Sequence, residues 1–162
     1  MFLAYDSGIE DKNRLLEFSS INGLDDLESS DRWACDGTFK VCSSAWYQLM
    51  SLNTITSDLC VLRLFALLPN KTKKTYHLFT TIKNLRPNCH PLYCMIDFEI
   101  AMHKAFLEVF QNAEVAGCSF LFGQSIWRNV SALGYSVKYN TDVEFQIKIR
   151  SFVHLCSCHS RM

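Results

Sequence analysis

The sequence predicts an α/β protein in which helices lie on the faces of a mixed β-sheet. Three observations lead to this class. The chain has 162 residues, of which 49% are apolar, so it can bury one core of ordinary domain size. Before Pro69 the apolar residues form short runs bounded by turn-forming residues. After Pro69 apolar residues at helical spacing alternate with such runs, and strands followed by this alternation are typical of a mixed sheet covered by helices.

The first part of the chain reads as two short strands and a helix. The apolar runs 2–5 and 14–18 are separated by "DSGIEDKN", which has the composition of a turn. Residues 21–30, "INGLDDLESS", predict a short helix. Asn22 is its expected cap, with two aspartates in the first turn.

Three longer strands are predicted next. Residues 33–41, "WACDGTFKV", form the first, and the runs 46–55 and 59–68 form a hairpin joined by "TSD". Asp36 is a carboxylate inside a segment that otherwise reads as a buried strand. Burying such a charge is costly unless it is paired, so Asp36 needs an explanation.

Helices and strands alternate after Pro69. A helix is predicted at 72–85, and 92–96, "LYCMI", predicts a central strand that is buried on both faces and ends at Asp97. The remaining elements are expected at 99–110 (helix), 115–120 (strand), 126–133 (helix) and 142–153 (helix), with the turn "YSVKYN" before the last one.

Composition excludes several classes of protein. Lys+Arg and Asp+Glu each number 16, whereas a protein that binds nucleic acid through basic tails is usually strongly basic. The eight cysteines lie mostly in apolar segments, and no secretory signal is evident, so a reducing compartment is expected rather than secretion. No apolar run approaches the ~18 residues of a membrane span, so no membrane association is expected.

Asp36 and Asp97 form a candidate metal site. Asp36 lies in the first long strand and Asp97 at the end of the fourth, and in a sheet of this topology these two strands are neighbours. Paired carboxylates repel each other, and a divalent cation such as Mg²⁺ relieves the repulsion. Each aspartate also has an ordinary interpretation, because Asp97 precedes a helix that it could cap and Asp36-Gly37 could be a turn. Composition and periodicity leave both alternatives open.

Four blocks of the sequence together resemble the transposase domain of Mutator-like elements (MULE). They are "WACDGTFKVCSSAWYQLMSLNTI", "FALLPNKTKKTYHLF", "MIDFEIAMHKAFLEVFQNAEVAGCSFLFGQSIWRNV" and "YNTDVEFQIKIR", and they extend the resemblance to Arg150. The resemblance implies a ribonuclease-H-like fold, and the predicted strands and helices follow the order that they have in that fold. It further implies a DDE-type transposase that uses Mg²⁺ or Mn²⁺ to cut and join DNA at transposon ends, acts as a multimer and works in the nucleus. Asp36 and Asp97 match the family's first two catalytic aspartates, which are metal ligands.

The chain departs from the family pattern in its acids and in the "GC…QS" block. The family's third acid is a glutamate that follows an inserted helical region, so the fold is expected to be incomplete at the C-terminus and the chain inactive alone. The four glutamates after Asp97 all come too early for that role: Glu99, Glu108, Glu114 and Glu144. Cys118 matches the family's cysteine, but Leu121 stands where a histidine is usual.

The end of the chain is unlike the family, so the domain is expected to span 1–152 and an atypical tail 153–162. The soft metal ligands Cys156, Cys158 and His159 in this tail favour an incidental cluster over a zinc site, which needs four spaced ligands. Three residues that could contact nucleic acid, Gln124, Trp127 and Arg128, have an ordinary interpretation as helix residues, as do Lys71, Lys73 and Lys74. The alternative function is a non-catalytic remnant of a domesticated transposon that binds DNA or protein.

Overall fold

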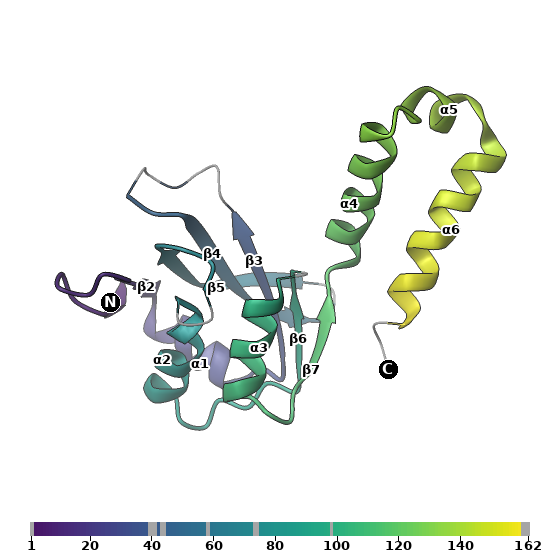
Figure 1. Ribbon diagram of the computed structural model, residues 1–162. Helices are drawn as coiled ribbons and strands as arrows, with labels where there is room; N and C mark the ends of the chain where they lie inside the picture. The colour runs from purple at the N-terminus through teal and green to yellow at the C-terminus, as the bar shows by residue number, and fades with distance from the viewer. Residues whose placement is uncertain are drawn as a thin grey trace. The chain divides into compact units, whose positions relative to one another are not determined.

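A computed structural model of the protein describes residues 2–38, 42, 45–57, 59–72, 75–97 and 99–159, with the backbone alone at 75 and 154–159. Figure 1 shows its helices and strands. The chain divides into two compact units, Met1–Val115 and Ala116–Met162, a division that the sequence pattern does not indicate.

Seven strands form one mixed sheet in the order β1-β2-β5-β4-β3-β6-β7, which confirms the predicted α/β class. Their bounds are β1 Leu3–Asp6, β2 Leu16–Ser19, β3 Arg32–Thr38, β4 Gln48–Thr56, β5 Leu59–Leu68, β6 Tyr93–Ile96 and β7 Glu114–Gly117. β3 and β6 pair in parallel, while the β1–β2, β2–β5, β5–β4 and β4–β3 pairs are antiparallel. The predicted hairpin is therefore β4–β5, and the first long strand lies between it and β6.

The helices of the first unit are α1 (Ile21–Ser29), α2 (Leu78–Leu85), which follows the short helix η1 (Thr75–His77), and α3 (Ile100–Val109). They enclose a core centred on Trp33, a fully buried residue of β3. Its ring meets Phe106 and Phe110 edge to face, and its indole N–H donates to the Leu27 carbonyl at 3.2 Å. A buried indole needs such an acceptor. The helices thus border one shared core against the sheet.

The start of α1 differs from the sequence prediction. Ser20, and not Asn22, is the N-cap, and its hydroxyl accepts a hydrogen bond of 2.9 Å from the Gly23 N–H. The first turn of this fully described helix holds no acidic residue. Asp25 and Asp26 instead form ion pairs, with Arg86 at 2.8 Å and with Arg63 at 2.6 Å.

β6 corrects a second expectation. It was predicted to be buried on both faces, but Cys94 and Ile96 are buried whereas Tyr93 and Met95 are only half-buried. The guanidinium of Arg32 on β3 lies 5.2 Å from the centre of the Tyr93 ring and shields it. The alternation shows that one face of β6 is buried more completely than the other.

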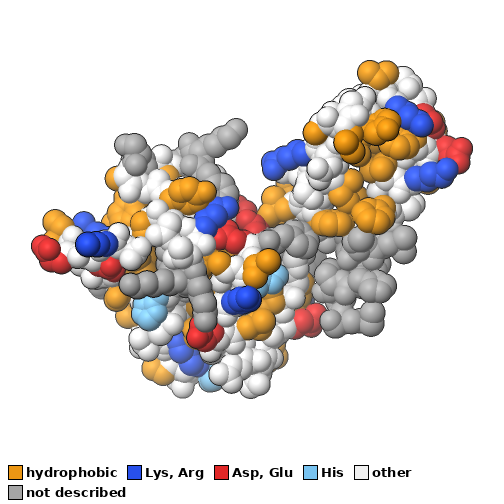
Figure 2. All heavy atoms as spheres, viewed as in Figure 1, with side chains coloured by type: hydrophobic (Ala, Val, Ile, Leu, Met, Phe, Trp, Pro, Cys, Tyr) orange, Lys and Arg blue, Asp and Glu red, His pale blue; other side chains and the backbone are white. Residues whose placement is uncertain are grey.

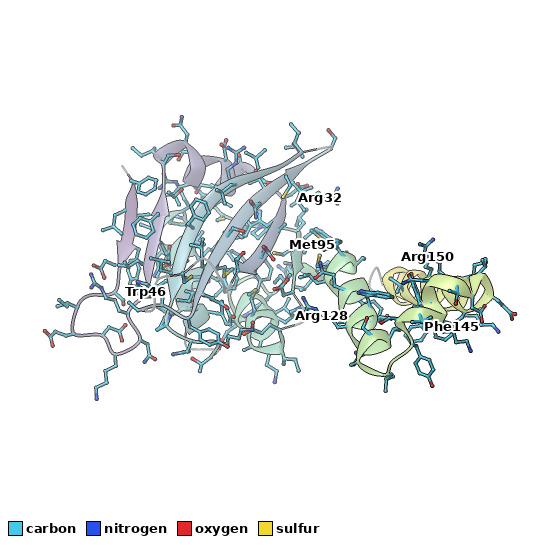
Figure 3. All side chains as sticks on the ribbon, turned by 90° about the horizontal axis from the view of Figure 1, so that it is seen from above. Arg32, Trp46, Met95, Arg128, Phe145 and Arg150 are labelled. Atoms are coloured by element: carbon cyan, nitrogen blue, oxygen red, sulfur yellow. The ribbon has the colours of Figure 1, made fainter. Side chains whose placement is uncertain are left out.

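The second unit consists of α4 (Ser119–Ala132), α5 (Ser136–Thr141) and α6 (Val143–His159). Two sequence predictions are wrong here, because the strand 115–120 ends at Gly117 and continues as α4, and "YSVKYN" is mostly the helix α5. Gly134 has a φ of 79° and lets the chain reverse after α4. Figure 3 labels Phe145 and Arg150 on α6; the Phe145 ring packs against Tyr135 at 5.9 Å between centres. The backbone of the atypical tail continues α6 as far as His159.

Candidate functional site

Asp36 lies inside β3 and is exposed to solvent. Its backbone pairs with Ser51 of β4, and Gly37 pairs with Met50, so Asp36-Gly37 is strand and not a turn. The residues just before it, Ala34 and Cys35, are buried. The strand therefore emerges from the core at Asp36, and this exposure removes the burial penalty that the sequence suggested.

Asp97 follows the last residue of β6 and is half-buried. It does not cap the next helix, because the N-cap of α3 is Glu99. Its carbonyl accepts two hydrogen bonds, from the Glu99 N–H at 2.7 Å and from Nε2 of His103 at 2.8 Å, which fix the turn between β6 and α3. Its Oδ1 is buried and has no hydrogen-bond partner in the described part of the chain. A buried oxygen without a donor leaves a ligand position open.

The parallel pairing of β3 and β6 brings the two aspartates together. Ala34 is opposite Met95, and Asp36 and Asp97 each follow two residues later. Burial raises the pKa of Asp97 to about 6, and the negative charge of Asp36 adds to the rise. A hydrogen bond from the Gly37 amide opposes it. The two carboxylates are thus close enough to repel each other, as a pair that shares a cation would.

A buried hydrogen-bond chain supports the turn that carries Asp97. Tyr76 of η1 donates its hydroxyl proton to Oε1 of Glu99 at 2.6 Å and accepts from Nε2 of Gln48 at 3.0 Å. Tyr76 and Gln48 are 1% and 0% exposed. Burial and the Glu99 charge raise the pKa of Tyr76 above its ordinary value, so the phenol remains a donor. Lys71 completes the group through an ion pair of 3.4 Å with Oε2 of Glu99.

Sequence reasoning missed this supporting group. Glu99 was considered only as a third acid and set aside, and Tyr76 and Gln48 were not singled out. The signal for Glu99 is its place two residues after Asp97. Tyr76 and Gln48 are 28 residues apart in the chain, and no local pattern connects them.

Asp36 and Asp97 are the residues that could hold a divalent cation. Asp36 and Asp97 supply hard oxygen ligands, and Mg²⁺ needs only one or two carboxylates because it keeps several waters. Among the described residues, no three histidine, cysteine or acidic side chains are grouped to hold a metal. Glu99 is turned to Tyr76 and Lys71, and Glu144 of the second unit pairs with Lys148 at 2.7 Å.

The other residues singled out in the sequence take ordinary places. Cys118 is the N-cap of α4, and Leu121 lies in the first turn of that helix. Trp127 packs against Tyr139 with 4.6 Å between ring centres, but it is 39% exposed and is therefore not the core aromatic that the ordinary interpretation expects. Two residues, Lys73 and Lys74, lie outside the described part of the chain. For Cys156, Cys158 and His159 only the backbone is described.

Charges are mixed over the face drawn in Figure 2, where Lys and Arg side chains are scattered among Asp and Glu. In the part of the chain that the structure describes, no helix has the length and apolar character to cross a membrane. Comparison of the chain with protein-family models, with curated proteins and with solved structures finds no match.

Proposed function

We propose that the protein is a transposase-derived domain with a ribonuclease-H-like sheet, in which Asp36 and Asp97 are the first two acids of a DDE site. One observation carries the proposal: the two aspartates of the family-like motifs lie at the same end of adjacent parallel strands, and the charge of Asp36 acts on Asp97. Neither has the alternative role of turn former or helix cap.

Asp36 and Asp97 would hold the Mg²⁺ or Mn²⁺ ion. Such an ion activates water and stabilises the leaving oxygen in phosphodiester cleavage when it is bound. The chain itself contributes the rest. Asp97 offers its Oδ1, which has no hydrogen-bond partner among the described residues. The Gly37 amide and the hydrogen bonds to the Asp97 carbonyl hold this acid in place. Lys71 offsets the nearby charge of Glu99. DNA at transposon ends is the proposed substrate, and the nucleus the proposed location.

The alternative is a non-catalytic module that binds DNA or protein. The contacts of Glu99 favour this alternative. Its carboxylate is bound by the Tyr76 hydroxyl and the Lys71 ammonium, so it is not available as a third metal ligand. A site with two acids binds one cation, whereas phosphodiester transfer commonly uses two ions. We therefore expect cation binding without efficient strand cleavage.

Mn²⁺ binding, followed by electron paramagnetic resonance of the free ion, tests the cation site. The unaltered protein should bind one Mn²⁺ in a saturable way, and Asp36→Asn should weaken binding by at least about tenfold because a ligand and its charge are lost. Asp31→Asn is the matched control, since Asp31 is an exposed aspartate just before β3. Equal binding by all three proteins would refute the site.

Nicking of supercoiled DNA in the presence of Mn²⁺ separates the two functions. Nicking that disappears in Asp36→Asn and persists in Asp31→Asn would support the enzyme. Mn²⁺ binding with no Asp36-dependent nicking would support the non-catalytic module.

A further inference from the structure

An aromatic ring and an ammonium group lie at the same end of the sheet as Asp36 and Asp97. Tyr47 directly precedes β4, whose first residues pair with the end of β3. Lys71 follows the end of β5. Neither residue is a ligand of the proposed cation site, and the sequence pattern does not connect Tyr47 with any motif for chemistry.

Lys71 is directed toward the site by its partners. Its Nζ lies 3.4 Å from Oε2 of Glu99 and 6.0 Å from the centre of the Tyr47 ring. Glu99 lies only two residues after Asp97, so this ion pair keeps the ammonium near the acids. Although Lys71 is paired with Glu99, its side chain is 38% exposed, so part of it faces solvent.

The segment that carries Lys71 is held in place. Oδ1 of Asn70 accepts hydrogen bonds from the N–H of Thr72 at 3.0 Å and from its hydroxyl at 2.8 Å. Nδ2 of Asn70 donates to Oδ1 of Asn13 at 3.1 Å, which ties the segment to the loop between β1 and β2. A fixed segment lowers the entropy that Lys71 loses when it binds a ligand.

Tyr47 is an exposed ring on a fixed backbone. It is 51% exposed, and its N–H donates to the Leu68 carbonyl at 2.9 Å, at the end of the β4–β5 pair. An exposed aromatic ring beside a cation is the combination that stacks an unpaired base and holds its phosphate in proteins that bind single strands.

We propose that Tyr47 and Lys71 form a strand-contacting surface that takes an unpaired DNA nucleotide beside Asp36 and Asp97, with the base on the Tyr47 ring and the phosphate on Lys71. The inference rests on the proposed function for the nature of the ligand, DNA. It adds which form of DNA is bound and by which residues.

An unpaired strand fits the observations better than a duplex. A base within a duplex is already stacked on its neighbours and cannot present a face to Tyr47. The chain has zero formal net charge, so it lacks the broad positive surface that duplex binding through phosphates requires. Stacking must therefore supply much of the binding free energy.

Fluorescence anisotropy tests the surface with the full chain in EDTA, so that no cation takes part. The probes are a fluorescein-labelled single strand and the duplex of the same sequence, at low salt. Tyr47→Leu should weaken binding of the single strand by about tenfold, and Tyr47→Phe should keep it because the ring remains. Leu59→Ala, at the exposed tip of the β4–β5 hairpin, is the control for lost apolar surface.

Lys71→Met tests the phosphate contact. It should lower the slope of log affinity against log salt by about 0.7, the value for one contact to a single strand. Lys104→Met, an exposed lysine of α3, should leave the slope unchanged. Circular dichroism of each variant checks the fold. If Tyr47→Phe binds the single strand as the unaltered protein does, the weaker binding of Tyr47→Leu is due to loss of the aromatic ring.

The outcomes separate this inference from the proposed function. Binding of the single strand that depends on Tyr47 supports the inference even when Mn²⁺ binding fails and the cation site is refuted. No binding of the single strand, equal binding by Tyr47→Leu, or a preference for the duplex that ignores Tyr47 overturns the inference even when Mn²⁺ binds at Asp36 and Asp97.

Discussion

Asp36 and Asp97, 61 residues apart in the numbering, occupy equivalent positions on two adjacent parallel strands, each two residues beyond the paired Ala34 and Met95. This pairing gives the protein an acidic site whose two members repel each other. Burial and the Asp36 charge together raise the pKa of Asp97 to about 6. The site therefore stores an unfavourable interaction that a cation, a proton or a substitution can relieve.

Asp97→Asn is expected to stabilise the cation-free protein. The folded state raises the pKa of Asp97, so ionising this side chain near neutral pH opposes folding. Asparagine keeps an acceptor for the Gly37 amide and carries no charge. We expect a gain on the order of 1 kcal/mol after allowance for solvent screening. Urea unfolding in EDTA measures it. Asp31→Asn should have little effect, and a loss of stability in Asp97→Asn would contradict the repulsion.

Glu17 should make stability fall with pH. It is fully buried on β2 and accepts a hydrogen bond from the Thr81 hydroxyl, while its Oε2 has no partner among the described residues. Burial raises its pKa to about 8 from the ordinary value of 4.5. Between these two pKa values, the folded state holds a proton that the unfolded state has released. The stabilisation is therefore complete below pH 4.5 and is lost as the pH rises to about 8.

Glu17→Gln should remove this decline, because the amide cannot ionise. Urea unfolding at about pH 6 and about pH 8 compares the two proteins. Glu10→Gln, an exposed glutamate of the β1–β2 loop, should keep the decline of the unaltered protein. The same pH dependence in Glu17→Gln as in the unaltered protein would show that Glu17 is not the group responsible.

Tyr76→Phe should destabilise the fold by about 1–3 kcal/mol, since it leaves buried polar groups unpaired. Gln48 loses the acceptor for its Nε2, and its Oε1 already has no partner within the described residues. Tyr5→Phe, on the half-buried edge strand β1, is the control and should change stability far less. Thermal unfolding of both variants makes the comparison. Adding Gln48→Leu to Tyr76→Phe should restore part of the lost stability. A further loss of stability in the double variant would argue against the pairing of Gln48 with Tyr76.

Cys35 and Cys94 should resist alkylation in the native protein. Their sulfur atoms lie 3.6 Å apart across β3 and β6, and both residues are buried. Burial raises the pKa of Cys94, and the thiolate is the reactive form. Iodoacetamide followed by peptide mass spectrometry should modify the exposed Cys60 first and these two only after unfolding. Rapid native labelling of Cys94 would show that the strands open locally.

Much of the fold follows from local pattern. The stripe of α3 was predicted because helical periodicity reports which face is buried. The hairpin β4–β5 and the strand before Asp97 were predicted because short apolar runs bounded by turn residues are typical of strands. The predictions failed at the ends of elements. The cap of α1 at Ser20 and the helix at 136–141 depend on short-range hydrogen bonds that several neighbouring residues could make equally well.

The sequence by itself singled out Asp36 and Asp97 as candidate acids, since each interrupts or ends an apolar run that is typical of a strand. The tertiary structure alone decided what surrounds them. Parallel pairing of β3 with β6 brought the acids together, and Tyr76 and Gln48 met Glu99 from distant parts of the chain. The reason is physical: a charge is visible in a sequence, but the free energy of its burial and pairing is set by atoms that only the folded chain brings near.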